Sequence, residues 1–358
     1  MIKLLREIIQ LFKTQKLYLF LFIGIICFYL IFFLMRKNSS LEKHVDPDKQ
    51  RIETLLKEAP QNPQEIERKL TNRPHLKWVV ELFTLFFMSS FAYGVWLGTV
   101  DLKKLFRKEE LIPQSDQTIN IAWGIADIVK VIILFFSFGI ALNLAVVGIK
   151  IFLSVPLDSS NYLLINTVIL DLAAIFFMIS IIYKMGAGIS DLIGFRLSQF
   201  PFEEFWWGIR TYFLILPVFA GILIVLVWIS NLLSYEPPAH PLVEILLQNE
   251  NTPISTIVSS LLVACVVGPI VEEIFFRGFF YPALRKYFGA GWTMIITAFF
   301  FAGVHGNLFA FLPVFFLGFV LCYLYEKRRN LICCISLHIV HNSAFLIYFF
   351  IMKSILFA

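Results

Sequence analysis

The chain has 358 residues, of which 59% are hydrophobic, 15% are charged and 40 are phenylalanine. Soluble domains carry about 25% charged residues, so this composition excludes an ordinary soluble domain and indicates a membrane protein. The formal net charge of +5 comes from Lys and Arg that cluster between apolar segments. Such clustering reflects membrane topology and does not indicate nucleic-acid binding.

The first half of the chain contains four apolar segments long enough to cross a hydrocarbon core about 30 Å thick. A basic amphipathic stretch, residues 1–16, precedes the first segment and is expected to lie on the membrane surface. A polar segment with four prolines, residues 36–77, follows it. We predict an N-terminal membrane region over residues 1–185, with spans at 17–35, 78–100, 131–153 and 162–183.

The second half, residues 186–358, contains five further apolar segments. An aromatic stretch with Glu203 and Glu204 precedes the first of them, and we assign these paired glutamates to the water interface and not to catalysis. The whole chain is therefore predicted to be an all-α, polytopic transmembrane helix bundle of eight or nine spans. The five segments of this half lie at 211–233, 254–284, 292–304, 309–325 and 331–352.

Basic residues alternate between the loops of the second half, which fixes a predicted orientation. The positive-inside rule places residues 101–118, 184–210, 285–291 and 326–330 in the cytoplasm. Nine spans then put the N-terminus inside and the C-terminus outside. One conflict remains, because this topology places residues 36–77 outside although that segment is rich in Lys and Arg.

Two adjacent carboxylates and an arginine interrupt the apolar segment 254–284. Charges inside a membrane are costly and are functional-site hypotheses by default. On a helix, Glu273 and Arg277 are at positions i and i+4, so we predict that they pair. Glu272 points about 100° away from Glu273 and needs another partner. Asp171, in the span 162–183, has no motif around it, and we predict for it a structural contact to a neighbouring helix.

Two histidines in the late spans, His305 and His338, are the predicted partners of Glu272. The depth of each side chain in the membrane can be estimated from the helix rise, counted from the nearest predicted cytoplasmic loop. It is roughly 20 Å for Glu272, roughly 21 Å for His305 and roughly 14 Å for His338. These depths allow the three side chains to meet inside the membrane. Asn342 follows His338 by four residues and shares its helix face. His341 is a further imidazole that could face the same space.

One carboxylate, two imidazoles and an amide, screened from lipid, are suited to hydrolysis. The carboxylate can take a proton from water, a histidine can orient the water or protonate a leaving amine, and the amide can donate to an oxyanion. Glu272, His305 and His338 could alternatively hold a catalytic Zn²⁺. The residues alone leave both possibilities open, and the chain has no His-Glu-x-x-His motif.

Three motifs together resemble those of the CPBP family of intramembrane proteases, the CAAX proteases and bacteriocin-processing enzymes, also called the Abi family. They are Glu272-Glu273-x-x-x-Arg277, Phe301-x-x-x-His305 and His338-x-x-x-Asn342. The resemblance is strong from Ile254 to the C-terminus and extends back to about Asp191, where Gly194-Phe195-Arg196 and the Phe-Trp-Trp stretch are similar to the lead-in of the family. It does not include the first 185 residues, so it implies a CPBP-like protease core over residues 186–358. It implies that Glu272 activates water with help from His305, that His338 and Asn342 stabilise the oxyanion, and that Glu273 and Arg277 support the site.

The resemblance implies an intramembrane endopeptidase with its active site inside the C-terminal bundle, acting by a Zn²⁺ or a metal-free glutamate mechanism. Its partners would be the lipid bilayer and a peptide or membrane-protein substrate, either a CAAX-type (prenylated) peptide or a leader peptide, and not nucleic acid. We expect a multi-pass protein of a bacterial cytoplasmic membrane. Two other functions are weighed against this one. One is a non-catalytic scaffold or immunity protein, and the other is a proton-coupled transporter, which usually has an inverted repeat that this chain lacks.

Overall fold

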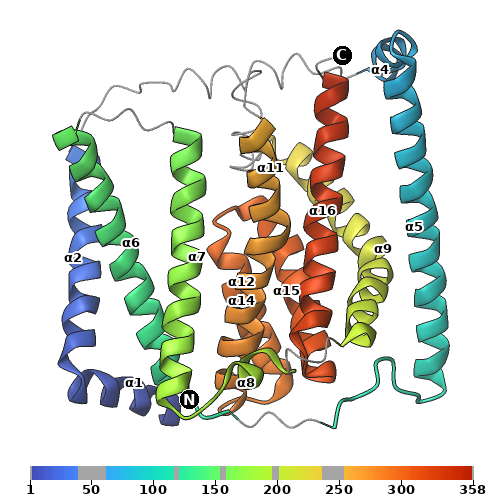
Figure 1. Ribbon diagram of the computed structural model, residues 1–358. Coiled ribbons are helices and arrows are strands. Elements are labelled where there is room, and N and C mark those ends of the chain that lie inside the picture. Colours follow the sequence, from blue (N-terminus) through green and yellow to red (C-terminus); the bar gives the residue numbers. More distant parts are fainter. Residues whose placement is uncertain are drawn as a thin grey trace.

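The computed structural model describes residues 2–38, 62–116, 121–153, 159–195, 201–235 and 254–356. Within these ranges the regular elements are all helices, which confirms the predicted all-α bundle (Figure 1). Part of the predicted polar segment, residues 39–61, lies outside the described residues. Eight described helices are long and apolar enough to cross a membrane: Lys16–Met35, Pro74–Phe106, Ile125–Ile149, Leu164–Lys184, Phe202–Leu232, Ile254–Arg285, Leu308–Arg328 and Leu331–Ile355.

The seventh predicted segment, residues 292–304, forms a shorter helix, α14 (Ala290–Val304), of 15 residues. At 1.5 Å per residue it extends for about 22 Å, less than the hydrocarbon core of about 30 Å. It packs along α15 (Leu308–Arg328), and the two form an antiparallel pair (Figure 1). The segment is therefore a helix of the bundle that is too short to be counted among the spans.

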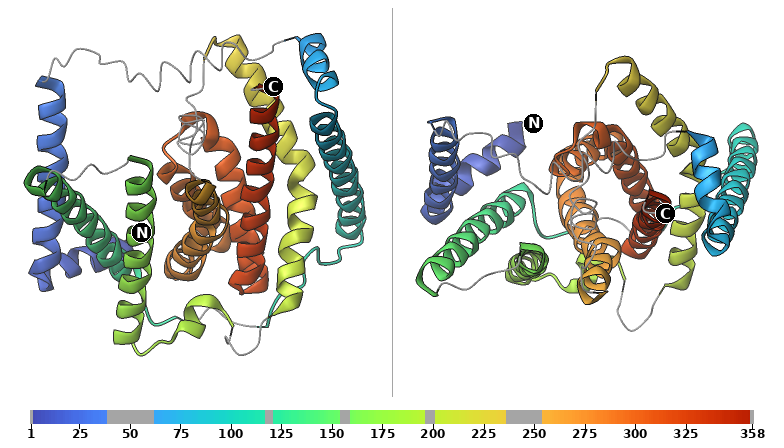
Figure 2. Two further views of the ribbon diagram at one scale, coloured as in Figure 1. Left: turned by 45° about the horizontal axis from the view of Figure 1, so that its top comes forward. Right: turned by 90° about the horizontal axis from the view of Figure 1, so that it is seen from above.

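The C-terminal helices form the centre of the molecule, and the N-terminal helices lie on both sides of it (Figure 2). The central group consists of α9 (Phe202–Leu232), the broken helix over residues 254–285, the α14–α15 pair and α16 (Leu331–Leu356). On one side lie α1 (Ile2–Thr14), α2 (Lys16–Asn38), α6 (Ile125–Leu153) and α7 (Ser159–Lys184), and on the other lie α4 (Pro63–Thr71) and α5 (Pro74–Phe106). The short α8 (Ile189–Ile193) lies at the lower end of the central group (Figure 1).

Two glycines let α9 pack closely against its neighbours on both sides. A Cβ atom at Gly94 of α5 would overlap the carbonyl oxygen of Phe213 in α9. A Cβ at Gly208 of α9 would overlap the Ser336 hydroxyl and the Cys333 carbonyl of α16. Because small residues allow helix backbones to approach within a membrane, α9 is held between α5 and α16.

The described parts of the loops predicted to be cytoplasmic lie at one end of the bundle, the lower end in Figure 1. Arg328 connects them. Its guanidinium group lies 2.6 Å from Glu204 and 2.9 Å from Glu203, and it donates to the Pro113 carbonyl at 3.2 Å. Glu203 and Glu204 lie in the first turn of α9, at this end of the bundle, and both pair with Arg328. Their place at the end of a helix agrees with the interfacial position predicted for them. The amphipathic α1 lies at the same end (Figure 1).

Candidate active site

The helix that carries the paired glutamates changes its register on both sides of them. It is α-helical over α11 (Ile254–Leu262), α12 (Gly268–Glu273) and α13 (Tyr281–Arg285), and π-helical over η1 (Val263–Val267) and η2 (Ile274–Phe280). The sequence analysis predicted one continuous helix here and missed both π-helical segments. Such segments are rare and are frequent at functional sites, where they re-aim side chains.

The first π-helical segment leaves one backbone carbonyl, that of Ala264, without a partner in its own helix. In the π register, the Ala264 carbonyl would accept from the residue five positions later. That residue is Pro269, which has no N–H to donate. The Asn342 amide of α16 donates to the Ala264 carbonyl instead, at 2.9 Å. This hydrogen bond fixes the amide of a predicted site residue, and Pro269 was the signal in the sequence.

Glu273 is fully buried and joins three helices. Its Oε1 accepts a hydrogen bond from Arg277 Nη1 at 2.8 Å, which confirms the predicted pair. The same oxygen lies 2.8 Å from His338 Nδ1 on α16. Arg277, also fully buried, donates a second bond from Nη2 to the Gly318 carbonyl of α15 at 3.1 Å. Glu273 and Arg277 therefore hold the helix around them against α15 and α16.

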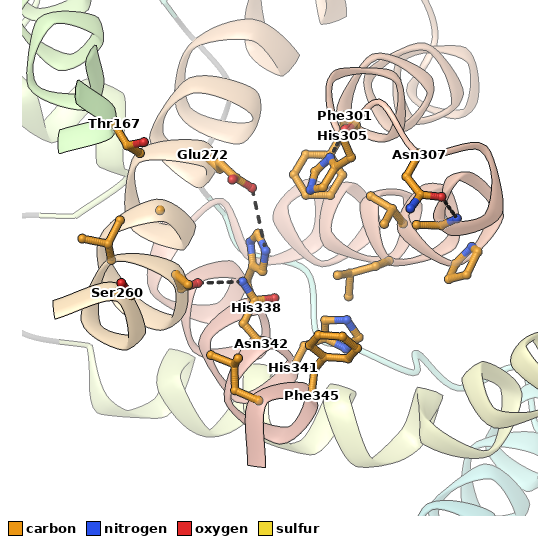
Figure 3. A pocket seen from close by; sticks show the side chains of 18 of the residues that line it. Thr167, Ser260, Glu272, Phe301, His305, Asn307, His338, His341, Asn342 and Phe345 are labelled. Carbon is orange, nitrogen blue, oxygen red and sulfur yellow. Dashed lines mark hydrogen bonds and ion pairs between the residues drawn. The ribbon is translucent and has the colours of Figure 1, made fainter. Parts of the chain in front are cut away.

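Glu272 faces the other nitrogen of the same histidine (Figure 3). Its Oε2 lies 3.8 Å from His338 Nε2. Among the described residues, this oxygen has no hydrogen-bond partner. Since a carboxylate accepts only from N–H or O–H groups, His338 Nδ1 donates to Glu273 and Nε2 remains directed at Glu272. The predicted partner of Glu272 thus lies beside it.

His305 ends α14 and has a defined tautomer. Its Nδ1 lies 2.7 Å from the Phe301 carbonyl, one turn earlier. A carbonyl can only accept, so Nδ1 bears the proton and a neutral ring keeps a lone pair at Nε2. The Phe301 ring contacts both histidines, with centroid separations of 5.0 Å to His305 and 5.7 Å to His338. The Arg277 guanidinium lies over the same ring, 4.4 Å from its centroid.

All four predicted catalytic residues line one cavity of about 720 Å³ (Figure 3). Glu272, His305, His338 and Asn342 come from α12, α14 and α16, whose positions in the sequence are far apart. The remaining wall is mostly aliphatic and aromatic, with contributions from α9 and α15. The cavity therefore brings together the groups that the sequence analysis selected.

Two residues have positions that the sequence did not settle. Asp171 was predicted to make a structural contact to a neighbouring helix. Asp171 lines the cavity, and no hydrogen bond or ion pair joins it to another described residue, so the predicted contact is not found among these residues. His341 also lines the cavity, and its ring packs against Phe219 of α9 with a centroid separation of 4.8 Å. Neither position could be predicted without the packing of α7 and α9.

The side chains of the site that are predicted as candidate metal ligands are Glu272, His305 and His338. A catalytic Zn²⁺ usually has three protein ligands at about 2.0–2.2 Å. Within the part of the chain that the structure describes, no group of three or more His, Cys, Asp or Glu side chains is arranged to hold a metal ion. The predicted set of Glu272, His305 and His338 therefore does not fit such an ion in this arrangement, and the chemistry below uses only the chain's own side chains.

Comparison with known proteins identifies the part of the chain that carries this site. No curated protein and no solved structure matches the chain. Residues 254–344 match a family model described as Rce1-like, the type II CAAX prenyl endopeptidase Rce1-like domain. The match contains Glu272, His305, His338 and Asn342 and excludes α5, α6, α7 and α9. The predicted resemblance is thus confirmed: residues 254–344 are an Rce1-like domain of the CAAX-protease type, set in a protein with several membrane-spanning helices.

Proposed function

We propose that this chain hydrolyses a peptide bond within the membrane, using a water molecule that Glu272 activates. The main support is the position of Glu272 on the cavity wall, 3.8 Å from His338 Nε2 and without a hydrogen-bond partner among the described residues. The Glu272 side chain is 38% exposed, so a water molecule in the cavity can reach its carboxylate and donate a hydrogen bond to it. The Rce1-like domain supports endopeptidase activity in general.

The first step needs a base and a group that aligns the water. Glu272 accepts one proton of the water while the water oxygen attacks the carbonyl carbon of the substrate. His305 is oriented by the Phe301 carbonyl, and the lone pair at its Nε2 accepts the other hydrogen of the same water. Two acceptors thereby direct the water oxygen toward the carbonyl carbon.

The second step needs hydrogen-bond donors for the oxygen that gains negative charge. The Asn342 amide has two N–H groups, and only one of them is directed at the Ala264 carbonyl. The other can donate to the oxyanion. His338 can assist when it also carries a proton at Nε2, with Nδ1 bound to Glu273. The proton held by Glu272 then passes to the leaving nitrogen as the C–N bond breaks, which releases a carboxyl product and an amine.

The fully buried pair behind the site acts through His338. Glu273 fixes the ring of His338 by the bond to Nδ1, and Arg277 balances the charge of Glu273. The two residues are therefore positioning residues and do not touch the reacting atoms. Removing Glu273 should weaken catalysis by releasing the ring, whereas removing Glu272 should remove the base.

The proposed substrate is a peptide or a membrane-protein segment that enters from the bilayer. The mostly apolar cavity wall supports an extended apolar segment, either a CAAX-type prenylated C-terminus or a leader peptide. The proposed location is a bacterial cytoplasmic membrane, with the Arg328 end of the bundle facing the cytoplasm.

The experiment measures cleavage of a reporter peptide by protein reconstituted in liposomes, together with the thermal stability of each variant. Glu272→Ala and His305→Ala should abolish cleavage while the melting temperature stays near that of the wild type. A non-catalytic scaffold predicts that the variants lose stability and that wild type cleaves nothing. A proton-coupled transporter predicts a proton flux that Glu272→Ala removes. Normal cleavage by both variants would overturn the proposal.

A further inference from the structure

Asp171 comes from a helix that the Rce1-like match does not include. It lies on α7, where Leu164, Thr167 and Asp171 follow one another at helical spacing and together line the cavity. Figure 3 shows Thr167, about one turn before Asp171, directed toward the space beside Glu272. One wall of the cavity is therefore built by the N-terminal region, and Asp171 is the charged residue of that wall.

Three buried carboxylates of the described chain have a cation beside them. Arg210 lies 2.5 Å from Asp101, Lys130 lies 2.8 Å from Asp127, and Arg277 lies 2.8 Å from Glu273. No Lys, Arg or His in the described ranges forms an ion pair with Asp171. Burying an unpaired charge is costly, and proteins usually provide a counter-charge for it. Asp171, which is partly buried, has no such counter-charge among the residues that the structure describes.

With its three histidines, His305, His338 and His341, in their neutral form, the cavity wall has an excess of negative charge. The described residues that line it include two carboxylates, Asp171 and Glu272, and neither Lys nor Arg. Both line one cavity, and two like charges in one cavity with low-dielectric walls repel one another. In a site with low-dielectric walls, such an excess attracts cations and repels anions more strongly than it would in water. An occupant with a positive charge would relieve the repulsion.

We infer that Asp171 binds a positively charged Lys or Arg side chain of the substrate, so that the enzyme prefers a basic residue near the cleaved bond. This inference rests on the proposed function. The proposed chemistry runs at Glu272 with or without such a residue, so Asp171 is a specificity-determining residue of the same cavity. A substrate with an acidic residue at the same position would be repelled by both carboxylates.

The test uses one reporter peptide that wild type cleaves in liposomes, with the cleaved bond located by mass spectrometry. Lys, Gln or Glu is placed at each position flanking that bond, and kcat/KM is measured at about pH 8, where a carboxylate is ionised. At one position, wild type should prefer Lys over Gln by about tenfold and Gln over Glu by a similar factor. The preference should reside mainly in KM.

Variants at the same position separate charge from structure. Asp171→Asn should bring the Lys-to-Gln ratio close to one, Asp171→Lys should make Glu the preferred residue, and Asp171→Glu should retain the preference for Lys. Thr167→Val is the control, since it removes a polar group from the same wall without changing the charge, and its ratio should equal that of wild type.

Two results would overturn the inference while the proposed function stands. One is equal cleavage of all three peptides by wild type at every position. The other is an unchanged Lys-to-Gln ratio in Asp171→Asn. If wild type cleaves no peptide in the liposomes, the proposed function fails first and the inference fails with it.

Discussion

Glu273 Oε1 lies 2.8 Å from His338 Nδ1, although the two residues are on different helices and far apart in the sequence. The same oxygen binds Arg277, so one carboxylate orients a histidine on α16 and balances a buried guanidinium. His338 then presents its other nitrogen to Glu272. The adjacent glutamates thus face opposite sides of one imidazole ring, with Glu273 in the packed interior and Glu272 at the cavity.

Replacing Arg277 should destabilise the protein strongly. Arg277→Ala leaves the fully buried Glu273 without its counter-charge, which costs about 3–5 kcal/mol in comparable buried pairs. The measurement is the apparent melting temperature in detergent micelles. Arg285→Ala is the control, because Arg285 is one-third exposed and its partner Glu326 keeps Arg329. Equal losses for both variants would contradict the role assigned to Arg277.

The close approach of α9 and α16 predicts a difference between two glycines of α9. Gly208→Ala should lower the melting temperature and the reporter activity, because a Cβ there overlaps α16 and would shift the helix that carries His338 and Asn342. Gly221→Ala is the matched control, since nothing lies within 4 Å of a Cβ at that position and alanine favours a helix. Similar behaviour of the two variants would show that α9 does not position α16.

Arg328 allows a comparison between two neighbouring carboxylates. Glu204 is 12% exposed and lies 2.6 Å from Arg328, whereas Glu203 is 75% exposed and lies 2.9 Å from it. Exposed ion pairs contribute about 0–1 kcal/mol, and shielded pairs contribute more. Glu204→Gln should therefore lower the melting temperature more than Glu203→Gln. The opposite order would mean that Arg328 depends on the exposed partner.

A chelator tests the fit of the donor groups to a metal ion. The described residues have no three-ligand group for such an ion, so cleavage by purified protein should persist after treatment with a strong chelator. Metal analysis of the treated sample is the control for removal of the ion. Loss of cleavage that Zn²⁺ restores would contradict this expectation and would mean that the ligands rearrange around a metal.

The sequence predicted those parts of the site that depend on local chemistry. The Glu273–Arg277 pair follows from helical spacing, and the meeting of Glu272 with His338 follows from their depths and the cost of charge in lipid. Glu273 was predicted to support the site, but its bond to His338 depends on how the helices pack and could not be read from spacing.

Features that arise between helices could not be predicted in the same way. The bond from Asn342 to the Ala264 carbonyl depends on the π-helical register of η1 and on Pro269, which has no N–H to donate there; the sequence analysis did not use that proline. The position of Asp171 depends on α7 packing against α11 and α12, and nothing around Asp171 in the sequence indicates that contact. Residues 292–304 were counted as a span because of their apolar composition, but α14 (Ala290–Val304) has only 15 residues and is shorter than a span.

The most direct test of the account compares kcat for Glu272→Gln and Glu273→Gln on one reporter peptide in the same liposomes. Both variants replace a carboxylate by an amide of similar size, and folding is checked by melting temperature. Loss of a general base costs about 10²–10⁴-fold, so Glu272→Gln should lower kcat by that factor. Glu273→Gln should retain more activity, because it removes only the orientation of His338. A higher kcat for Glu272→Gln than for Glu273→Gln would contradict the assignment of Glu272 as the base.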